Sequence, residues 1–174
     1  ALLTMGGAIV LSGTGGFTLS SGGTLACAHA SGLDGNITTT TTSFSTAANY
    51  TYNGTSVQVT GSLLPATVNH LTINNSAGVT LSSSATVDGT LALTSGKIAT
   101  GANQINLAAS GAVSGASASS YVNGTLQRAF NTGGSQRFVF PIGDGSRYTP
   151  VALSNLNVTV AGDVAAKTTA SEHP

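Results

Sequence analysis

The stretch Leu71-Thr-Ile-Asn-Asn-Ser-Ala-Gly-Val-Thr-Leu81 decides the fold, because its apolar pattern returns in Leu91-Ala-Leu-Thr-Ser-Gly-Lys-Ile98 after an offset of about twenty residues. A further apolar residue, Val87, follows the first copy, and Ile105 and Leu107 follow the second. Repeats of this length are typical of solenoids, in which stacked units bury together a core that no unit buries alone. The repeat therefore predicts that each copy is one coil of a stack.

A looser third copy begins near Val113 and extends through Tyr121-Val122 to Leu126. No window keeps the i, i+3, i+4, i+7 apolar spacing of a helix over three turns. Short runs of Val, Ile, Leu and Thr alternate instead with dipeptides that favour turns, which are Asp34-Gly35, Asn53-Gly54, Asp88-Gly89, Asn123-Gly124 and Asp144-Gly145. This pattern of short strands and turns predicts an all-β fold with a right-handed parallel β-helix over residues 1–126.

The length of the expected strands changes after Gln127. Longer strands are expected at Arg137–Pro141, Tyr148–Leu153 and Leu156–Val160. Aromatic and basic residues also concentrate between Arg128 and Tyr148. Residues 127–174 are expected to begin an antiparallel β-sandwich or to cap the solenoid, since three strands are too few to close a sandwich.

Charged residues make up only 6% of the chain, with five acids and five bases, against roughly 25% in an average soluble domain. No basic stripe is present to bind the phosphates of a nucleic acid, and no apolar run approaches the roughly 20 residues of a membrane helix. Neither nucleic-acid binding nor membrane insertion is expected. Ser, Thr and Asn supply the polarity instead, which favours an extracellular location.

The stretches Gly61–Leu81, Gly89–Gly96, Tyr121–Leu126, Phe138–Asp144 and Tyr148–Val151 together resemble the β-helical regions of very large secreted, adhesin-like surface proteins of Bacteroidota and related bacteria. The resemblance covers nearly the whole chain. It implies a bacterial cell-surface location and a non-catalytic role. In that family further sandwich strands follow the strand near Pro150, and they are missing here.

No catalytic, cofactor or metal site is expected. Asp34, Asp88 and Asp144 each precede a glycine and are interpreted as turn residues, with an ion pair from Asp144 to Arg147 in the last turn. Two further acids, Asp163 and Glu172, lie near the C-terminus. A catalytic carboxylate pair would have to combine acids from different coils.

The single cysteine, Cys27, is expected to be a buried apolar residue, with an intermolecular disulfide as the alternative. His29, His70 and His173 are too dispersed to form a ligand set, although Cys27 and His29 share one face of a strand. The run Thr38–Thr42 is interpreted as a β-branched strand at the edge of the solenoid in preference to an ice-binding array.

Three functions remain open. The first is a non-catalytic structural or adhesive module of a large secreted protein, whose partners are neighbouring domains, identical subunits, glycans or surfaces. The second is a self-assembling extracellular fibre subunit completed by strands of a neighbour, which the interrupted strands at both ends of the chain motivate. The third is a carbohydrate-binding or carbohydrate-active β-helix.

Two sets of residues are candidates for these contacts. Glycan contacts are expected from flat faces of outward Thr and Asn side chains and from the aromatic residues Tyr50, Tyr52 and Tyr121, which are expected to be exposed. Assembly strands are expected near the two ends of the chain, at Leu2, Leu3, Ile9, Val10, Leu156, Val158 and Val160.

Overall fold

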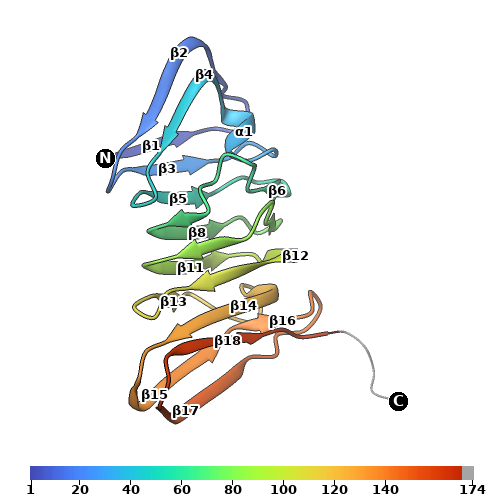
Figure 1. Ribbon diagram of the computed structural model, residues 1–174. Coiled ribbons are helices and arrows are strands. Elements are labelled where there is room, and N and C mark those ends of the chain that lie inside the picture. Colours follow the sequence, from blue (N-terminus) through green and yellow to red (C-terminus); the bar gives the residue numbers. More distant parts are fainter. Residues whose placement is uncertain (170–174) are drawn as a thin grey trace.

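The computed structural model describes residues 1–169, and it is almost all β (2% helical), with a parallel β-solenoid of about 7 turns (Figure 1). One side of the stack is a six-stranded parallel sheet to which successive coils each contribute one strand. In stacking order these strands are β1 (Leu2–Met5), β3 (Thr24–Cys27), β5 (Asn49–Tyr52), β8 (His70–Asn74), β11 (Thr90–Ser95) and β13 (Ala112–Ser114).

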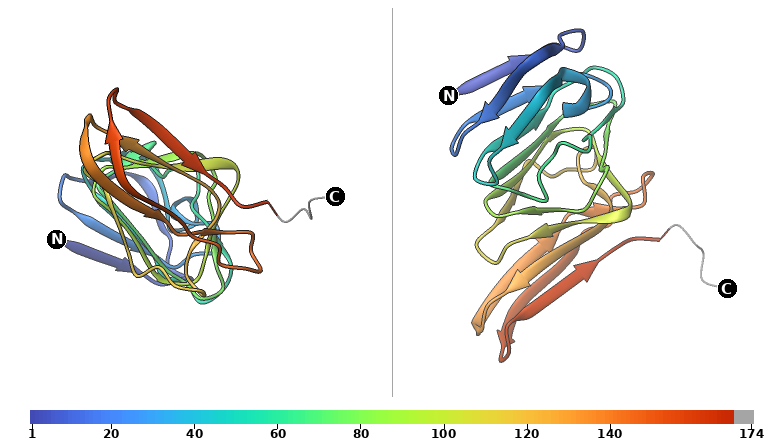
Figure 2. Two further views of the ribbon diagram at one scale, coloured as in Figure 1. Left: turned by 90° about the horizontal axis from the view of Figure 1, so that it is seen from below. Right: turned by 45° about the horizontal axis from the view of Figure 1, so that its top comes forward.

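An eight-stranded sheet forms the remaining sides of the later coils. Its strands are β6 (Gln58–Val59), β7 (Thr67–Val68), β9 (Val79–Thr80), β10 (Ala85–Val87), β12 (Ile98–Leu107), β14 (Val122–Phe130), β16 (Ile142–Gly143) and β18 (Gly162–Ala166). Strand β12 pairs with β9 through Ile98 and with β10 through Ile105, with a register shift between them. One long strand thus covers two sides of its coil, and the coils overlie one another when viewed along the stack (Figure 2).

Strands β2 (Leu11–Leu19) and β4 (Ile37–Phe44) form the corresponding sides of the first two coils as a separate parallel pair. The run Thr38–Thr42 lies in β4, as a mostly exposed β-branched strand. The described residues also include one helical turn, α1 (Leu33–Asn36), which the sequence pattern does not predict. It precedes β4 in the second coil (Figure 1).

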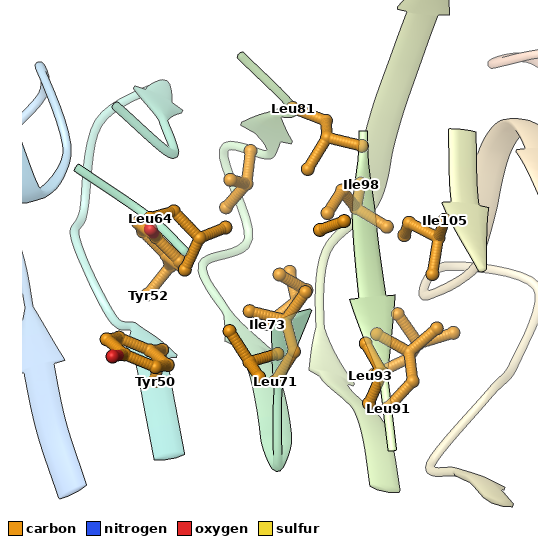
Figure 3. Packing of buried hydrophobic residues seen from close by; sticks show 14 of the residues in the cluster. Tyr50, Tyr52, Leu64, Leu71, Ile73, Leu81, Leu91, Leu93, Ile98 and Ile105 are labelled. Carbon is orange, nitrogen blue, oxygen red and sulfur yellow. The ribbon is translucent and has the colours of Figure 1, made fainter. Parts of the chain in front are cut away.

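The repeat read from the sequence is confirmed residue by residue. Leu71 pairs with Leu91 and Ile73 with Leu93 in the six-stranded sheet, and all four side chains are fully buried. In the other sheet the equivalent pairs are Val79 with Ile98 and Val87 with Leu107. Equivalent side chains therefore stack on one another along the axis of the solenoid (Figure 3), which is what holds the coils in register.

The third copy is also confirmed. Val113 pairs with Leu91, Val122 with Ile98, and Leu126 with Ile105. Strand β14, however, continues through the expected boundary at residue 126 and ends at Phe130. Parallel pairing then resumes between Val122 and Ile142, so the chain returns to the stack after the expected end of the solenoid.

The antiparallel sandwich expected after Gln127 is not confirmed. The two strands expected at Tyr148–Leu153 and Leu156–Val160 are a single strand, β17 (Val151–Val158), in which Asn155 has a positive φ of 53°. It pairs antiparallel with β15 (Gly133–Phe140). Strand β18 then pairs antiparallel with β14. The segment forms a hairpin and an added strand on the last coil, because its apolar residues pack onto the existing core.

Candidate functional site

The turn acids have structural partners. The Asp34 carboxylate accepts hydrogen bonds from the backbone N–H groups of Ser62 (2.7 Å) and Leu63 (2.9 Å), so it fastens α1 to the loop of the next coil. The Asp144 carboxylate accepts from the backbone N–H of Arg147 (2.8 Å) and from the N–H and hydroxyl of Ser146 (3.0 and 2.8 Å). The expected ion pair between Asp144 and the Arg147 side chain is therefore wrong, because the carboxylate bonds to the backbone N–H of Arg147 instead.

These hydrogen bonds hold the pKa of Asp144 below its ordinary value, first through the Arg147 N–H, because they favour the charged form. Asp88 lies between β10 and β11, and its backbone carbonyl accepts a hydrogen bond from the Ser110 hydroxyl (3.4 Å). Asp163 is exposed in β18, and Glu172 lies outside the described residues.

Cys27 is buried with 1% of its surface exposed, as expected. Burial raises the pKa of its thiol to about 11. The ring of neighbouring His29 accepts a hydrogen bond at Nδ1 from the Ser31 N–H (3.0 Å). Within residues 1–169 no three His, Cys, Asp or Glu side chains come together in a way that could hold a metal ion, and His173 lies outside this range.

The expectation that Tyr50, Tyr52 and Tyr121 contact glycans is wrong, because their side chains are only 1%, 0% and 0% exposed. In β5 the alternation places Asn49 and Thr51 outward and both tyrosines inward. The Tyr50 hydroxyl donates to the Ser45 carbonyl (3.1 Å) and that of Tyr52 donates to the Thr60 carbonyl (2.7 Å). A tyrosine can thus occupy a core position when a backbone acceptor lies at the end of its ring.

The candidate assembly residues differ between the two ends. Leu2, Leu3, Ile9 and Val10 are 68%, 40%, 52% and 47% exposed, the first two in β1 and the others in the connection to β2. At the C-terminal end Leu156 and Val158 are half-buried against the core, and Val160 lies 79% exposed after β17. Only the N-terminal set thus combines a sheet edge with exposed core-type residues.

One polar surface has the regularity of a binding face. It consists of the outward residues of β3, β5, β8 and β11, here called the hydroxyl face, which are Thr24, Asn49, Thr51, His70, Thr72, Thr90 and Ala92. These residues form two columns, because Thr24 pairs with Asn49 and then His70, while Thr51 pairs with Thr72 and then Ala92. Adjacent strands are about 4.8 Å apart, which sets the spacing along each column.

Hydrogen bonds order the hydroxyl face. The Asn49 amide donates to the Thr24 hydroxyl (3.2 Å) and accepts from the Asn69 amide (2.9 Å). His70 accepts at Nδ1 from the Thr90 N–H (2.8 Å), so its neutral ring carries the proton on Nε2. The face forms a shallow hollow of about 320 Å³ with hydroxyl, amide and imidazole groups and no charged lining residue. Such groups suit a neutral, hydroxyl-rich ligand.

The sequence predicts flat Thr/Asn faces, but it does not show which residues form the hydroxyl face. In the sequence, the residues of this face stand on either side of an inward residue in each strand, as in Asn49-Tyr-Thr51, His70-Leu-Thr72 and Thr90-Leu-Ala92. The coils differ in length, with offsets of 25, 21 and 20 residues between paired positions of β3 and β5, β5 and β8, and β8 and β11, so the columns cannot be aligned by a fixed period. The stacking of strands brings them together.

The chain matches no known family model, and no curated protein or solved structure shows a significant similarity to it. None of the helices in the described part of the chain has the length and apolarity needed to cross a membrane.

Proposed function

We propose that this chain is a non-catalytic structural module of a large extracellular bacterial surface protein, in which the solenoid acts as a stiff spacer that carries adhesive surface. The observation that supports this role best is the continuity of the stack. Parallel pairing runs without interruption from β1 to β13 in the six-stranded sheet, over fully buried rungs such as Leu71 and Leu91. Bending such a stack would break ladder hydrogen bonds and open packed rungs at the same time.

The low charge also suits a spacer. Outward positions of neighbouring coils lie about 4.8 Å apart, where identical charges would repel one another. Thr and Asn fill these positions here and bond to one another, as Asn69, Asn49 and Thr24 do. The stability of such a surface depends little on salt concentration, because it has few charges that salt could screen.

Stiffness is measurable by the distance between two spin labels. Labels on cysteines introduced at the exposed positions Ser21 and Val160 report on the first coils and the C-terminal hairpin, and buried Cys27 stays unlabelled. With the labelled chain diluted into an excess of unlabelled chain, we expect one narrow distance distribution. A broad or multi-peaked distribution would contradict the spacer role. A matched pair at Ser21 and Val57, which lies in the middle coils, locates any flexible segment.

The location and the lack of catalysis need separate tests. Antibodies against the chain should label intact cells that produce it, and labelling only after permeabilisation would contradict a surface location.

The absence of catalysis is tested by incubation with neutral and acidic polysaccharides, which should release no new sugar ends. Release that disappears in Asp88→Asn or Asp144→Asn would show that the chain is an enzyme.

The hydroxyl face supports a second candidate function, the binding of a neutral glycan along the strands. We expect a neutral oligosaccharide to perturb the NMR signals of Thr51, His70 and Thr72, and His70→Ala with Thr72→Val to abolish the effect. Thr42→Val in exposed β4 is the matched control and should change nothing. Perturbation spread evenly over both Thr-rich surfaces would indicate non-specific contact.

A further inference from the structure

A second hollow lies on the eight-stranded sheet, apart from the hydroxyl face. It has a volume of about 280 Å³, and its lining residues all fall within residues 57–123. In the pairing of β9, β12 and β14, Ala99 lies between Thr80 on one side and Asn123 on the other. Because alanine has the smallest side chain of the three, this outward column dips at Ala99. The hollow is therefore formed by the stacking of coils in the middle of the chain.

The positive charge of this hollow comes from Lys97, the only lysine or arginine in residues 1–127. Its ammonium donates a hydrogen bond to the Gly145 carbonyl (2.5 Å), and Nζ lies 5.1 Å from the centroid of the Tyr121 ring. These two contacts hold the ammonium in place. The carbonyl occupies only one of its N–H donors, so the remaining donors are available to a ligand.

Lys97 forms no ion pair with a carboxylate of residues 1–169. Asp144 precedes the Gly145 partner of Lys97, but its carboxylate accepts hydrogen bonds from the Ser146 hydroxyl and the Arg147 N–H instead (2.8 Å each). The ammonium is half-buried. Water screens a half-buried charge less than a fully solvated one, so its attraction for an anion is stronger. The hollow therefore favours a ligand with a negative charge.

The other lining residues indicate what kind of molecule carries that charge. Ser119 and Asn123 supply hydroxyl and amide groups beside Lys97, whereas Val57 and Ala77 supply apolar surface. A sugar ring likewise combines hydroxyl groups with apolar C–H faces. The volume lies at the small end of the range for ligand pockets, roughly 300–1,000 Å³, which suits a single ring. One lysine also matches the single charge of a sugar carboxylate better than the higher charge of a phosphate.

We infer that this hollow binds one carboxylate-bearing sugar of an acidic polysaccharide. The carboxylate accepts hydrogen bonds from the Lys97 ammonium, and the ring hydroxyls bond to Ser119 and Asn123. This site differs from the hydroxyl face in its position and in the charge of its ligand. It does not depend on the spacer role proposed above.

Titration of the isotope-labelled chain with methyl glucuronide, followed by NMR, tests the inference. Methyl glucoside is the ligand control, because it has the same ring with a hydroxymethyl group in place of the carboxylate. We expect the glucuronide to shift the amide signals of Lys97, Ser119 and Asn123, and the glucoside to bind more than about tenfold more weakly. Equal binding of the glucoside would overturn the inference. So would equal binding of inorganic phosphate, which would indicate a general anion site.

Two variants of the chain test the same contact in different ways. Lys97→Met removes the ammonium and retains the apolar stem of the side chain. Ser119→Asp, at an exposed position of a turn, adds a negative charge to the hollow and leaves the residues that contact Lys97 unchanged. Each variant should weaken glucuronide binding by more than about tenfold. Ser43→Asp, at an exposed position of β4, is the matched control, because it changes the net charge equally and should bind normally.

The NMR signals outside the hollow report whether each variant folds, and Ser119→Asp decides the outcome if Lys97→Met does not fold. Unchanged binding in Ser119→Asp would overturn the inference, and so would an equal loss of binding in Ser43→Asp. The spin-label distances report stiffness, and the signals of Thr51 and Thr72 report on the hydroxyl face. Failure of the acidic-sugar site therefore remains distinguishable from failure of the spacer role or of the hydroxyl face.

Discussion

At the scale of single residues, the buried tyrosines show how this solenoid accommodates polar atoms in its core. The hydroxyls of Tyr50 and Tyr52 reach backbone carbonyls. The Tyr121 hydroxyl is equally buried, but it has no hydrogen-bond partner among the described residues. The two kinds of site have opposite energetic consequences, because a paired hydroxyl stabilises the fold and an unpaired one costs desolvation energy.

Substitution by phenylalanine separates these consequences. We expect Tyr52→Phe to lower the free energy of unfolding by about 1 kcal/mol, since it removes the bond to the Thr60 carbonyl. Tyr121→Phe removes a hydroxyl without a partner among residues 1–169 and should be neutral or stabilising. Urea unfolding measures both. Equal losses in the two variants would contradict the assignment of these hydroxyls.

Alkaline pH is expected to destabilise the fold. Burial raises the pKa of Cys27 from 9.0 to about 11, that of Tyr50 from 10.0 to about 12, and that of Tyr52 well above its ordinary value. The unfolded chain then loses these protons at lower pH than the folded chain does. The stabilisation is complete below about pH 9 and is lost as the pH rises through the folded-state pKa values.

Urea unfolding at about pH 7 and about pH 10.5 measures this loss. Cys27→Ala should reduce the difference in unfolding free energy between the two pH values, because one of the groups that cause the difference is removed.

The Cys27 thiol should also resist disulfide reagents in the native chain and react at once after denaturation. Rapid reaction of the native chain would contradict its burial.

At the scale of elements, Arg128 fastens the C-terminal hairpin to the solenoid. Its guanidinium donates to the carbonyls of Gly111 and Ala109 (2.5 and 2.8 Å) in the turn before β13. The same group lies over the ring of Phe138 in β15, with 4.4 Å from Cζ to the ring centroid. One side chain of β14 thus joins a turn of the preceding coil to the hairpin.

We expect Arg128→Lys to lower the free energy of unfolding by about 1–3 kcal/mol, because a lysine cannot replace the planar fork that bonds two carbonyls and stacks on Phe138. Arg137→Lys, at an exposed position of β15, is the matched control and should have little effect. Denaturant unfolding of both variants is the measurement. A similar loss in the two would mean that the planar geometry of Arg128 is unimportant.

At the scale of the whole molecule, the stability of the described stack should decrease from its middle coils toward its ends. Coils in the middle, such as those of β8 and β11, have neighbours on both sides and fully buried rungs. The first coil has a neighbour on one side only within the described chain, and most residues of β2 are exposed. In a solenoid each coil is stabilised chiefly by its nearest neighbours.

Hydrogen exchange should reveal this gradient. We expect amides of β3 that bond to β1 to exchange faster than those that join β8 to β11. The hairpin of β15 and β17 provides a comparison at the C-terminal end. Uniform protection from end to end would show that the coils unfold as one cooperative unit and would contradict graded stability.

The sequence by itself determined the β-solenoid and much of its register. Apolar side chains must recur at equivalent positions of each coil to stack, so Leu71 with Leu91 and Ile73 with Leu93 were legible from their spacing. Burial of Cys27 and the role of Asp144 in its turn also followed from residue chemistry.

Only the tertiary structure decided which surfaces are exposed. The alternation of residues along a strand does not show which of the two sets faces inward when both sets contain bulky or polar side chains. In β5, packing placed Tyr50 and Tyr52 inside and Thr51 outside. The hydroxyl face joins residues of different coils, whose unequal lengths hide their alignment. The pairing of the C-terminal strands likewise depends on the core on which they pack, because their contacts are with residues distant in sequence.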